Sequence, residues 1–283
     1  MKKFLIILLI IVILISTCLL YSRFIATSGL KVKEYKVVNN KIIDEYHGLK
    51  IVHLSDIHYG STILEKQLEN IVNKVNELKP DIVVLTGDLI DERLEYNQDE
   101  IINQLKKIKA KLGKYAISGN HDKPIDDYNY IISESGFKSL DDTYELIYNN
   151  SNQPIIISGI STNYENSSNM GIKTEQFDKY ISNLSADDIK PIYSILLIHE
   201  PDFIDNLDLN NYDLVLSGHS HGGQVRLPLI GKIFTPYGSE KYYDEYYKIN
   251  NTDLYISSGL GTSKIKFRLF NKPSFNFYRI TNK

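Results

Sequence analysis

The chain has 283 residues, of which 42% are hydrophobic and 24% charged, a balance typical of a globular fold with a buried core. Its formal net charge is −3 and it has no basic block, which argues against a nucleic-acid partner because such partners need a basic face. The single cysteine, Cys18, excludes a disulfide framework and a thiolate metal site in the body of the protein.

An unbroken run of apolar or small residues covers positions 4–21, after a short basic start. About 18 such residues suffice for a membrane-spanning helix, and core helices are rarely so uniform. We therefore expect an uncleaved signal anchor over residues 1–23, in a single-pass protein whose following domain lies outside the cytoplasm. A cleaved signal with a small-residue site at residues 26–28 and lipidation of Cys18 stay open as alternatives.

Residues 24–48 are polar and irregular, with one strand expected at 35–38, and we interpret them as a tether and a leading strand. The main domain is expected to span residues 49–283. It begins with a strand at 49–55, followed by a helix at 63–78 in which apolar residues recur at helical spacing. Pro80 ends that helix.

A strand–helix alternation continues from there. Residues 81–86 form a continuous apolar strand of the kind that is buried on both faces. A helix is expected at 99–112 and a strand at 115–118. This order predicts a parallel, right-handed βαβ start and an α/β fold.

The second half is richer in strands. We expect a helix near residues 174–183 and a loop at 161–172. The expected strands are 144–148, 154–160, 192–198, 213–217, 254–257 and 275–280.

Polar clusters follow five of these strands, at the point where each strand ends. In chain order they are Asp56 and His58, then Asp88, then Asn120, His121 and Asp122, then His199, then His219 and His221. In open α/β sheets the carboxyl ends of the strands form one edge, where active sites lie. A mixture of carboxylate, amide oxygen and imidazole suits Mn, Fe or Zn, and a pair of such ions can clamp a phosphate and acidify a water.

Each cluster also has a simpler interpretation when taken alone. Asp56 or Asp88 would most often cap a helix, and Asn120 would most often be a turn residue. His199 alone would more often be an ordinary core or surface histidine. We reject these interpretations jointly, because five unrelated polar turns at five strand ends are improbable.

Together, Asp-x-His, Gly-Asp, Gly-Asn-His-Asp, a lone His after a strand and Gly-His-x-His resemble the calcineurin-like metallophosphoesterase family. These motifs span residues 56–221. The stretches 222–228 and 256–263, with Arg268 and Pro273 beyond them, resemble the branch of single-pass bacterial envelope members. Ser258 and Ser274 depart from the pattern of that branch.

The resemblance implies a four-layer α/β/β/α sandwich with a dinuclear centre of two divalent transition-metal ions, and a bridging hydroxide as nucleophile. It implies Asp56, His58 and His221 as ligands of the first ion, Asn120, His199 and His219 as ligands of the second, and Asp88 as the bridge. It also implies that His121 stabilises the developing charge or protonates the leaving oxygen, with Asp122 orienting it.

The function that follows is metal-dependent hydrolysis of phosphate mono- or diesters. The alternative is a membrane-tethered, non-catalytic metal-binding scaffold of the same fold. Two segments, the loop 161–172 and the tyrosine-rich stretch 237–247, are expected to wall the pocket. Their aromatic content would suit an envelope lipid or a sugar phosphate as substrate.

Overall fold

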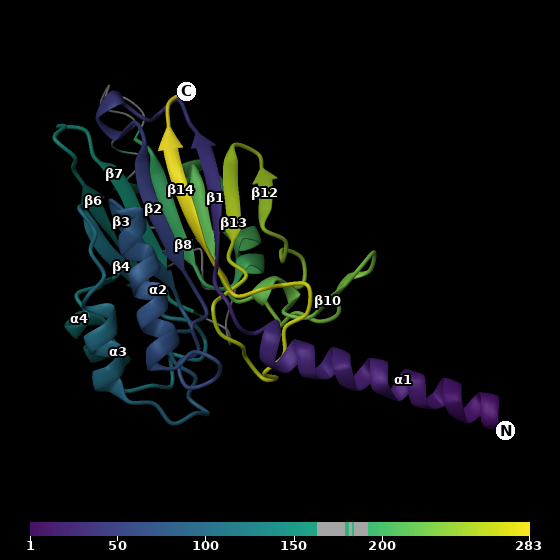
Figure 1. The fold of residues 1–283 in the computed structure, drawn as a ribbon. Coiled ribbons are helices and arrows are strands. Elements are labelled where there is room, and N and C mark those ends of the chain that lie inside the picture. The colour runs from purple at the N-terminus through teal and green to yellow at the C-terminus, as the bar shows by residue number, and fades with distance from the viewer. Residues whose placement is uncertain (163–178, 181–182, 184–191) are drawn as a thin grey trace.

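The computed structural model describes residues 1–162, 179–180, 183 and 192–283. Two six-stranded sheets lie against each other, and three helices cover the outer face of the first sheet (Figure 1). The helices are α1 (Lys2–Leu20), α2 (Glu65–Leu78), α3 (Gln98–Leu105) and α4 (Tyr128–Glu134). Of these, α2, α3 and α4 form the helical layer.

The first sheet has the order β1-β14-β2-β3-β4-β5. Its strands are β1 (Lys31–Val38), β14 (Ser274–Thr281), β2 (Leu49–Leu54), β3 (Ile82–Thr86), β4 (Gly113–Ile117) and β5 (Lys138–Ser139). Strands β2 to β5 are parallel, as the βαβ pattern predicts. Strand β14 runs antiparallel to β2, and β1 pairs with β14 along its whole length, so the leading strand is a full member of the sheet.

The second sheet has the order β12-β13-β9-β8-β7-β6. Its strands are β12 (Tyr246–Ile249), β13 (Thr252–Ile256), β9 (Leu214–Ser217), β8 (Ser194–Ile198), β7 (Ile155–Ile160) and β6 (Thr143–Ile147). The four central strands are parallel, and the two edge strands are antiparallel to their neighbours. A separate short hairpin joins β10 (Arg226–Leu227) to β11 (Gly231–Lys232).

The apolar alternation along each strand distributes its side chains between two layers. In β2, Val52 and Leu54 pack against the helices, whereas Ile51 packs between the sheets. On the outer face of the second sheet, Phe203 and Ile204 from a 3₁₀ segment pack against the strands. The fold is the mixed α/β fold expected from the sequence, preceded by an N-terminal apolar helix.

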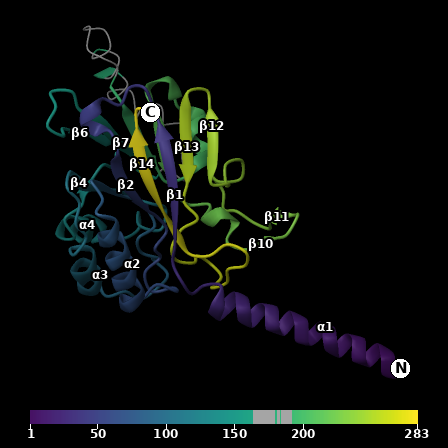
Figure 2. The same ribbon diagram turned by 45° about the horizontal axis from the view of Figure 1, so that its top comes forward.

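Helix α1 continues into a short π-helical segment, Tyr21–Ile25, and leaves the domain as an exposed rod (Figures 1 and 2). Together they form a 24-residue helix with a mean hydropathy of 3.1, long and apolar enough to cross a membrane. An N-terminal signal sequence has the same character.

The sequence misplaced some elements. Helix α3 ends at Leu105 rather than at residue 112, because tertiary hydrogen bonds capture the backbone beyond it: Lys109 N–H donates to Asn76 Oδ1 and Leu112 N–H to the Asp81 carbonyl. Helix α4 and the edge strand β12 were not predicted. The helix expected near residues 174–183 lies mostly outside the described residues.

Candidate metal centre

The polar ends of strands from both sheets meet at one place. Strands β2, β3 and β4 of the first sheet and β8 and β9 of the second end there. His58 Nε2, after β2, lies 3.2 Å from His221 Nε2, after β9. Asp88 Oδ2, after β3, lies 3.2 Å from His199 Nε2, after β8. The structure therefore brings together side chains that are up to 165 residues apart in the sequence because the two sheets share this edge.

Two groups of ligand atoms result. Asp56, His58 and His221 each offer an atom within 4.8 Å of the others, and so do Asp88, His199 and His219. All six residues are buried. We call Asp56, His58 and His221 the first set, and Asn120, His199 and His219 the second set, with Asp88 between them.

The backbone at this centre is strained. Five of these residues have left-handed φ angles, a conformation that costs a residue other than glycine about 1–3 kcal/mol. The residues are Asp56 (52°), His58 (43°), Asp88 (54°), His219 (64°) and His221 (48°). Strain of this kind persists only where the surroundings hold it, and it concentrates at functional sites.

Glycines in the motifs allow the loops to approach the carboxylates. A Cβ atom at Gly119 would overlap Asp88 Oδ1, and one at Gly218 would overlap the Ser55 hydroxyl and crowd Asp56 Oδ2. The glycines that precede Asn120 and His219 are therefore required by close packing around the acids.

The second set is held by backbone carbonyls. His199 Nδ1 donates to the Thr86 carbonyl at 2.6 Å, and His219 Nε2 donates to the Tyr237 carbonyl at 2.8 Å. The remaining nitrogens, His199 Nε2 and His219 Nδ1, face each other at 3.2 Å. These bonds fix the ring orientations and leave a lone pair on each neutral ring for a cation.

The first set is held differently. Asp56 accepts hydrogen bonds from the Ser55 hydroxyl at 2.6 Å and from the His219 backbone N–H at 3.0 Å. Among the described residues, neither His58 Nδ1 nor His221 Nδ1 has a hydrogen-bond partner. The Asp91 carboxylate lies 3.5 Å from His58 Nδ1, at ion-pair distance.

Asn120 tests whether this donor set suits a metal. Its side-chain Oδ1 is buried and has no hydrogen-bond partner among the described residues. A buried carbonyl oxygen without a partner is costly unless something else satisfies it. With buried carboxylates and converging imidazoles beside it, the Asp and His clusters fit a dinuclear centre of divalent ions.

Burial and mutual charge set the protonation of this centre. Burial raises the pKa of Asp88, but the neighbouring His199 and His58 outweigh it and hold this pKa well below its usual range. Burial likewise opposes protonation of His199, yet Asp88 holds its pKa well above the usual value. Burial and the neighbouring His199 lower the pKa of His219 to about 3. A cation bound here would therefore compete with protons.

His121 lies at the rim of the centre, and its partner differs from the one expected. Its Nδ1 lies 2.6 Å from the Glu92 carboxylate, and its backbone N–H donates to Asp88 Oδ1 at 3.0 Å. The expectation that Asp122 orients this ring is wrong in this structure. Asp122 is buried beneath the loop and accepts hydrogen bonds from the backbone N–H groups of Leu89, Ile90 and Gly119.

Asp122 instead braces the loops that carry Asp88 and Asn120. Burial and the charge of Asp88 raise its pKa to about 7. Sequence reasoning missed Asp91 and Glu92, which follow Asp88 by three and four residues. The available signal in the sequence was the pair of acidic residues shortly after Asp88, but acidic residues are common in such turns.

A pocket of about 370 Å³ opens onto the centre. Its lining includes both polar and apolar residues. The polar ones include Asp88, Asn120, His121, His219 and His221, and the apolar ones include Val225, Ile233, Phe234 and Ile265. The expected tyrosine-rich wall is not found at residues 237–247: Tyr242 is buried against Asp205, and Tyr237 contributes its carbonyl to His219. Most of the loop 161–172 lies outside the described residues.

Arg268, singled out in the sequence, is fully buried. Its guanidinium donates to the carbonyls of Ser258, Gly259 and Gly261, and burial lowers its pKa to about 10. It thereby folds the tail loop against Asp56, whose backbone carbonyl accepts from the Gly261 N–H at 2.7 Å.

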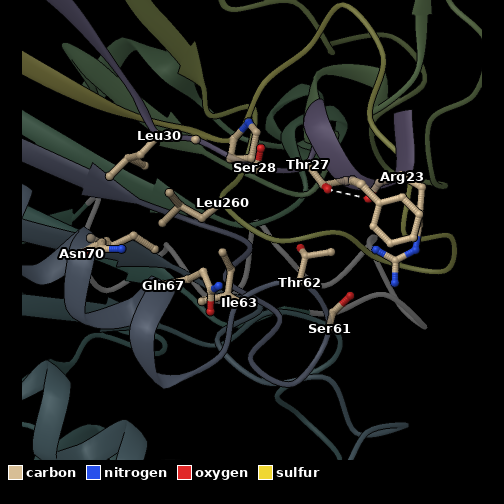
Figure 3. Close-up of a pocket in the computed structure, with 14 residues that line it drawn as sticks. Arg23, Thr27, Ser28, Leu30, Ser61, Thr62, Ile63, Gln67, Asn70 and Leu260 are labelled. Atoms are coloured by element: carbon tan, nitrogen blue, oxygen red, sulfur yellow. Dashed lines mark hydrogen bonds between the residues drawn. The ribbon is translucent and has the colours of Figure 1, made fainter. Parts of the chain in front are cut away.

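A second cavity of about 470 Å³ lies at the root of α1 and contains none of the candidate ligands. Figure 3 shows Arg23 and Thr27 on one side, facing Ser61 and Thr62 of the loop after β2. The end of the apolar helix thus packs against the domain close to the loop that carries His58.

The geometry agrees with comparisons to known proteins. The family model described as "Calcineurin-like phosphoesterase" matches residues 49–223, a range that contains all of the candidate ligands. "Uncharacterized metallophosphoesterase YkuE" from Bacillus subtilis is 30% identical over 267 residues, which cover 92% of this chain and 88% of that protein.

Two further relatives match a smaller part of this chain. "Phosphodiesterase YaeI" from Escherichia coli is 26% identical, over 75% of both chains. "Transmembrane protein with metallophosphoesterase domain" from Danio rerio is 28% identical over 84% of this chain but only 54% of that protein.

Proposed function

This chain belongs to the calcineurin-like phosphoesterase family and is a metal-dependent phosphoesterase, and from this premise we propose that it hydrolyses phosphate mono- or diesters at a dinuclear metal centre with seven protein ligands. Asp56, His58 and His221 would hold one ion, Asn120, His199 and His219 the other, and Asp88 would contact both. The observation that carries this proposal is the buried, unpartnered Oδ1 of Asn120 beside two converging pairs of imidazoles.

Asp88 is suited to the shared position. Its Oδ2 lies 3.5 Å from His58 Nε2 and 3.2 Å from His199 Nε2, so one carboxylate oxygen faces both sets. Two ions held there would neutralise the phosphate charge and acidify a water into a hydroxide nucleophile.

His121 is the residue we propose for proton transfer to the leaving oxygen. It lines the pocket, and it belongs to neither ligand set. Glu92 accepts a hydrogen bond from Nδ1 and so fixes the orientation of the ring. A positioned acid of this kind contributes roughly 10²–10⁴-fold to a rate.

We also propose that the protein is a single-pass membrane protein with its catalytic domain outside the cytoplasm. The 24-residue apolar helix at the N-terminus supports the anchor. Positive charges flank its apolar run on both sides, with Lys2 and Lys3 before the run and Arg23, Lys31 and Lys33 after it, and a long following domain can translocate regardless of such charges. Protease added to intact cells after removal of the wall should degrade the domain. Full protection until lysis would reverse the orientation.

Metal analysis combined with turnover tests the chemical proposal. The full chain, purified in detergent and reconstituted with Mn or Zn, should bind about two ions and hydrolyse a water-soluble aryl phosphodiester. One ion or fewer would contradict the dinuclear assignment. Two ions without turnover of mono- or diesters would favour the scaffold alternative.

A further inference from the structure

Large apolar side chains are exposed around one side of the pocket mouth. They come from the β10–β11 hairpin with the turn after it, and from the tail loop at residues 264–272. We call them the apolar rim: Leu227, Leu229, Ile230, Ile233, Phe234, Ile265 and Phe270. Large exposed apolar side chains gathered on two paired loops mark an interaction surface rather than ordinary surface composition.

Two members of the rim are held in an unfavourable conformation. Leu229 has a φ angle of 68° and a fully exposed side chain, and Phe270 has a φ angle of 51° and is 68% exposed. Bulky residues rarely adopt left-handed angles, and neither side chain gains burial within the domain in return. The strain indicates that these side chains serve a contact outside the domain.

The tail loop that carries Ile265 and Phe270 is hydrogen-bonded to the π-helical segment that continues α1. Arg268 N–H donates to the Ser22 carbonyl at 3.0 Å, at the root of the apolar helix. The next residue, Leu269, bridges to Val225, and its carbonyl accepts from Arg226 N–H at the start of the hairpin. The tail loop therefore links the helix and the hairpin into one surface.

Strand register places this surface at the same edge as the metal centre. Lys31, the first residue of β1, pairs with Ser274, and two residues further along β14, Asn276 pairs with His53 near the end of β2. Figures 1 and 2 both show the hairpin leaving the domain on the side of α1, with its tip beyond the root of that helix.

The rim continues into the pocket and is accompanied by positive charge. Ile233, Phe234 and Ile265 are both exposed members of the rim and walls of the pocket. The tail loop carries Lys264, Lys266 and Lys272 and has no acidic residue between positions 263 and 273. Apolar side chains beside lysines suit the boundary between acyl chains and phosphate headgroups.

We propose that the apolar rim enters the interfacial layer of the bilayer that α1 crosses, and that the pocket takes the phosphoester headgroup of a membrane lipid. The proposal rests on the phosphoesterase function proposed above and names its substrate class. The bilayer is the occupant that fits, because the tail loop that carries part of the rim is hydrogen-bonded to the root of a helix long enough to span it. The acyl chains would leave the pocket along Ile233 and Phe234, while the phosphate faces the metal ligands.

The absence of tryptophan from the chain allows a direct test of the membrane contact. Ile230→Trp in the full chain places the sole tryptophan at the hairpin tip. The matched control is Val38→Trp, at the far end of β1, where the native side chain is 54% exposed. In vesicles of phosphatidylcholine and phosphatidylglycerol, brominated lipid should quench the fluorescence of the Ile230→Trp variant and leave that of the Val38→Trp variant unquenched. Equal quenching of both, or of neither, would overturn the proposal.

A second test concerns the substrate and keeps the two proposals separable. It compares two aryl phosphodiesters. In one the second ester group is diacylglycerol, and this substrate is presented in the same vesicles; in the other it is methyl, and this substrate is water-soluble. The double variant Leu229→Asn with Ile230→Ser removes two rim side chains that do not line the pocket, and asparagine tolerates the left-handed angle.

We expect this variant to lose roughly tenfold or more on the lipid ester, because rim insertion is weakened, and to keep wild-type turnover of the soluble ester. Equal activity of variant and wild type on the lipid ester would overturn the inference and leave the phosphoesterase function intact. Failure of the wild type on both esters would instead count against the proposed function.

Discussion

The two ligand sets of the candidate centre each contain a pair of histidines, but the two pairs are held in place by different means. In the second set, His199 and His219 each donate to a backbone carbonyl, of Thr86 and Tyr237. In the first set, His58 has only the Asp91 carboxylate 3.5 Å away at Nδ1, and among the described residues His221 Nδ1 has no partner.

This difference has a consequence for metal binding. Rings fixed by the backbone are already oriented before an ion arrives, so the ion does not have to order them. Rings without such partners gain their orientation from the ion itself. We therefore expect the second set to bind its ion more tightly, and the first set to depend on Asp91.

Removing Asp88, the acid shared by both sets, should abolish metal binding at both sets. We expect Asp88→Ala to lose both ions and all measurable turnover, because its Oδ2 faces His58 and His199 alike. Metal analysis after reconstitution gives the result. Asp88→Asn is the control, since it keeps the shape and an acceptor for the His121 N–H. Retention of both ions in Asp88→Ala would show that the sets are independent.

His121→Ala should affect chemistry without affecting either set. Its backbone N–H, which donates to Asp88, is unchanged by the substitution. We expect a fall in turnover of roughly 10²–10⁴ with both ions retained. The rate of hydrolysis should fall more for an alkyl ester than for an activated aryl ester, whose leaving group needs little protonation. Wild-type hydrolysis of the alkyl ester would disprove the acid role, and loss of an ion would make His121 a ligand.

Asp91→Asn should separate the two sets. We expect it to lower the affinity for one of the two ions by about 10–100-fold, the usual effect of removing an acid that hydrogen-bonds a metal-binding histidine. Chelator competition should then show two distinct steps. Arg93→Gln is the matched control, because it removes another partner of Asp91 and leaves His58 untouched. Equal weakening of both ions would contradict the proposed difference.

Glu92→Gln should have the smallest effect. Its carboxylate contacts His121 and neither ligand set, so both ions should stay bound. We expect about a tenfold fall in turnover from a less well positioned ring. The loss should be greater for alkyl than for aryl esters, as for His121→Ala, and a uniform loss on both would indicate a merely structural role.

The sequence alone predicted most of the central fold, because parallel strands buried on both faces are continuous apolar runs with polar residues at their ends. Strands β2, β3, β8 and β9 were each found within two residues of their observed bounds. The helix boundary at Leu105 was not predictable, since hydrogen bonds that the Lys109 and Leu112 N–H groups donate to the distant Asn76 and Asp81 decide it.

The motifs determined which residues gather at the carboxyl edge, because that edge is common to all parallel strands of a sheet. The partners of those residues were decided only by the tertiary structure. Glu92 rather than Asp122 meets His121, because the buried Asp122 is used by three backbone N–H groups of its own and a neighbouring loop. Tertiary structure likewise decided where the tail loop lies, because a hydrogen bond from the Arg268 N–H to the Ser22 carbonyl joins it to the end of the N-terminal apolar helix, far away in the chain.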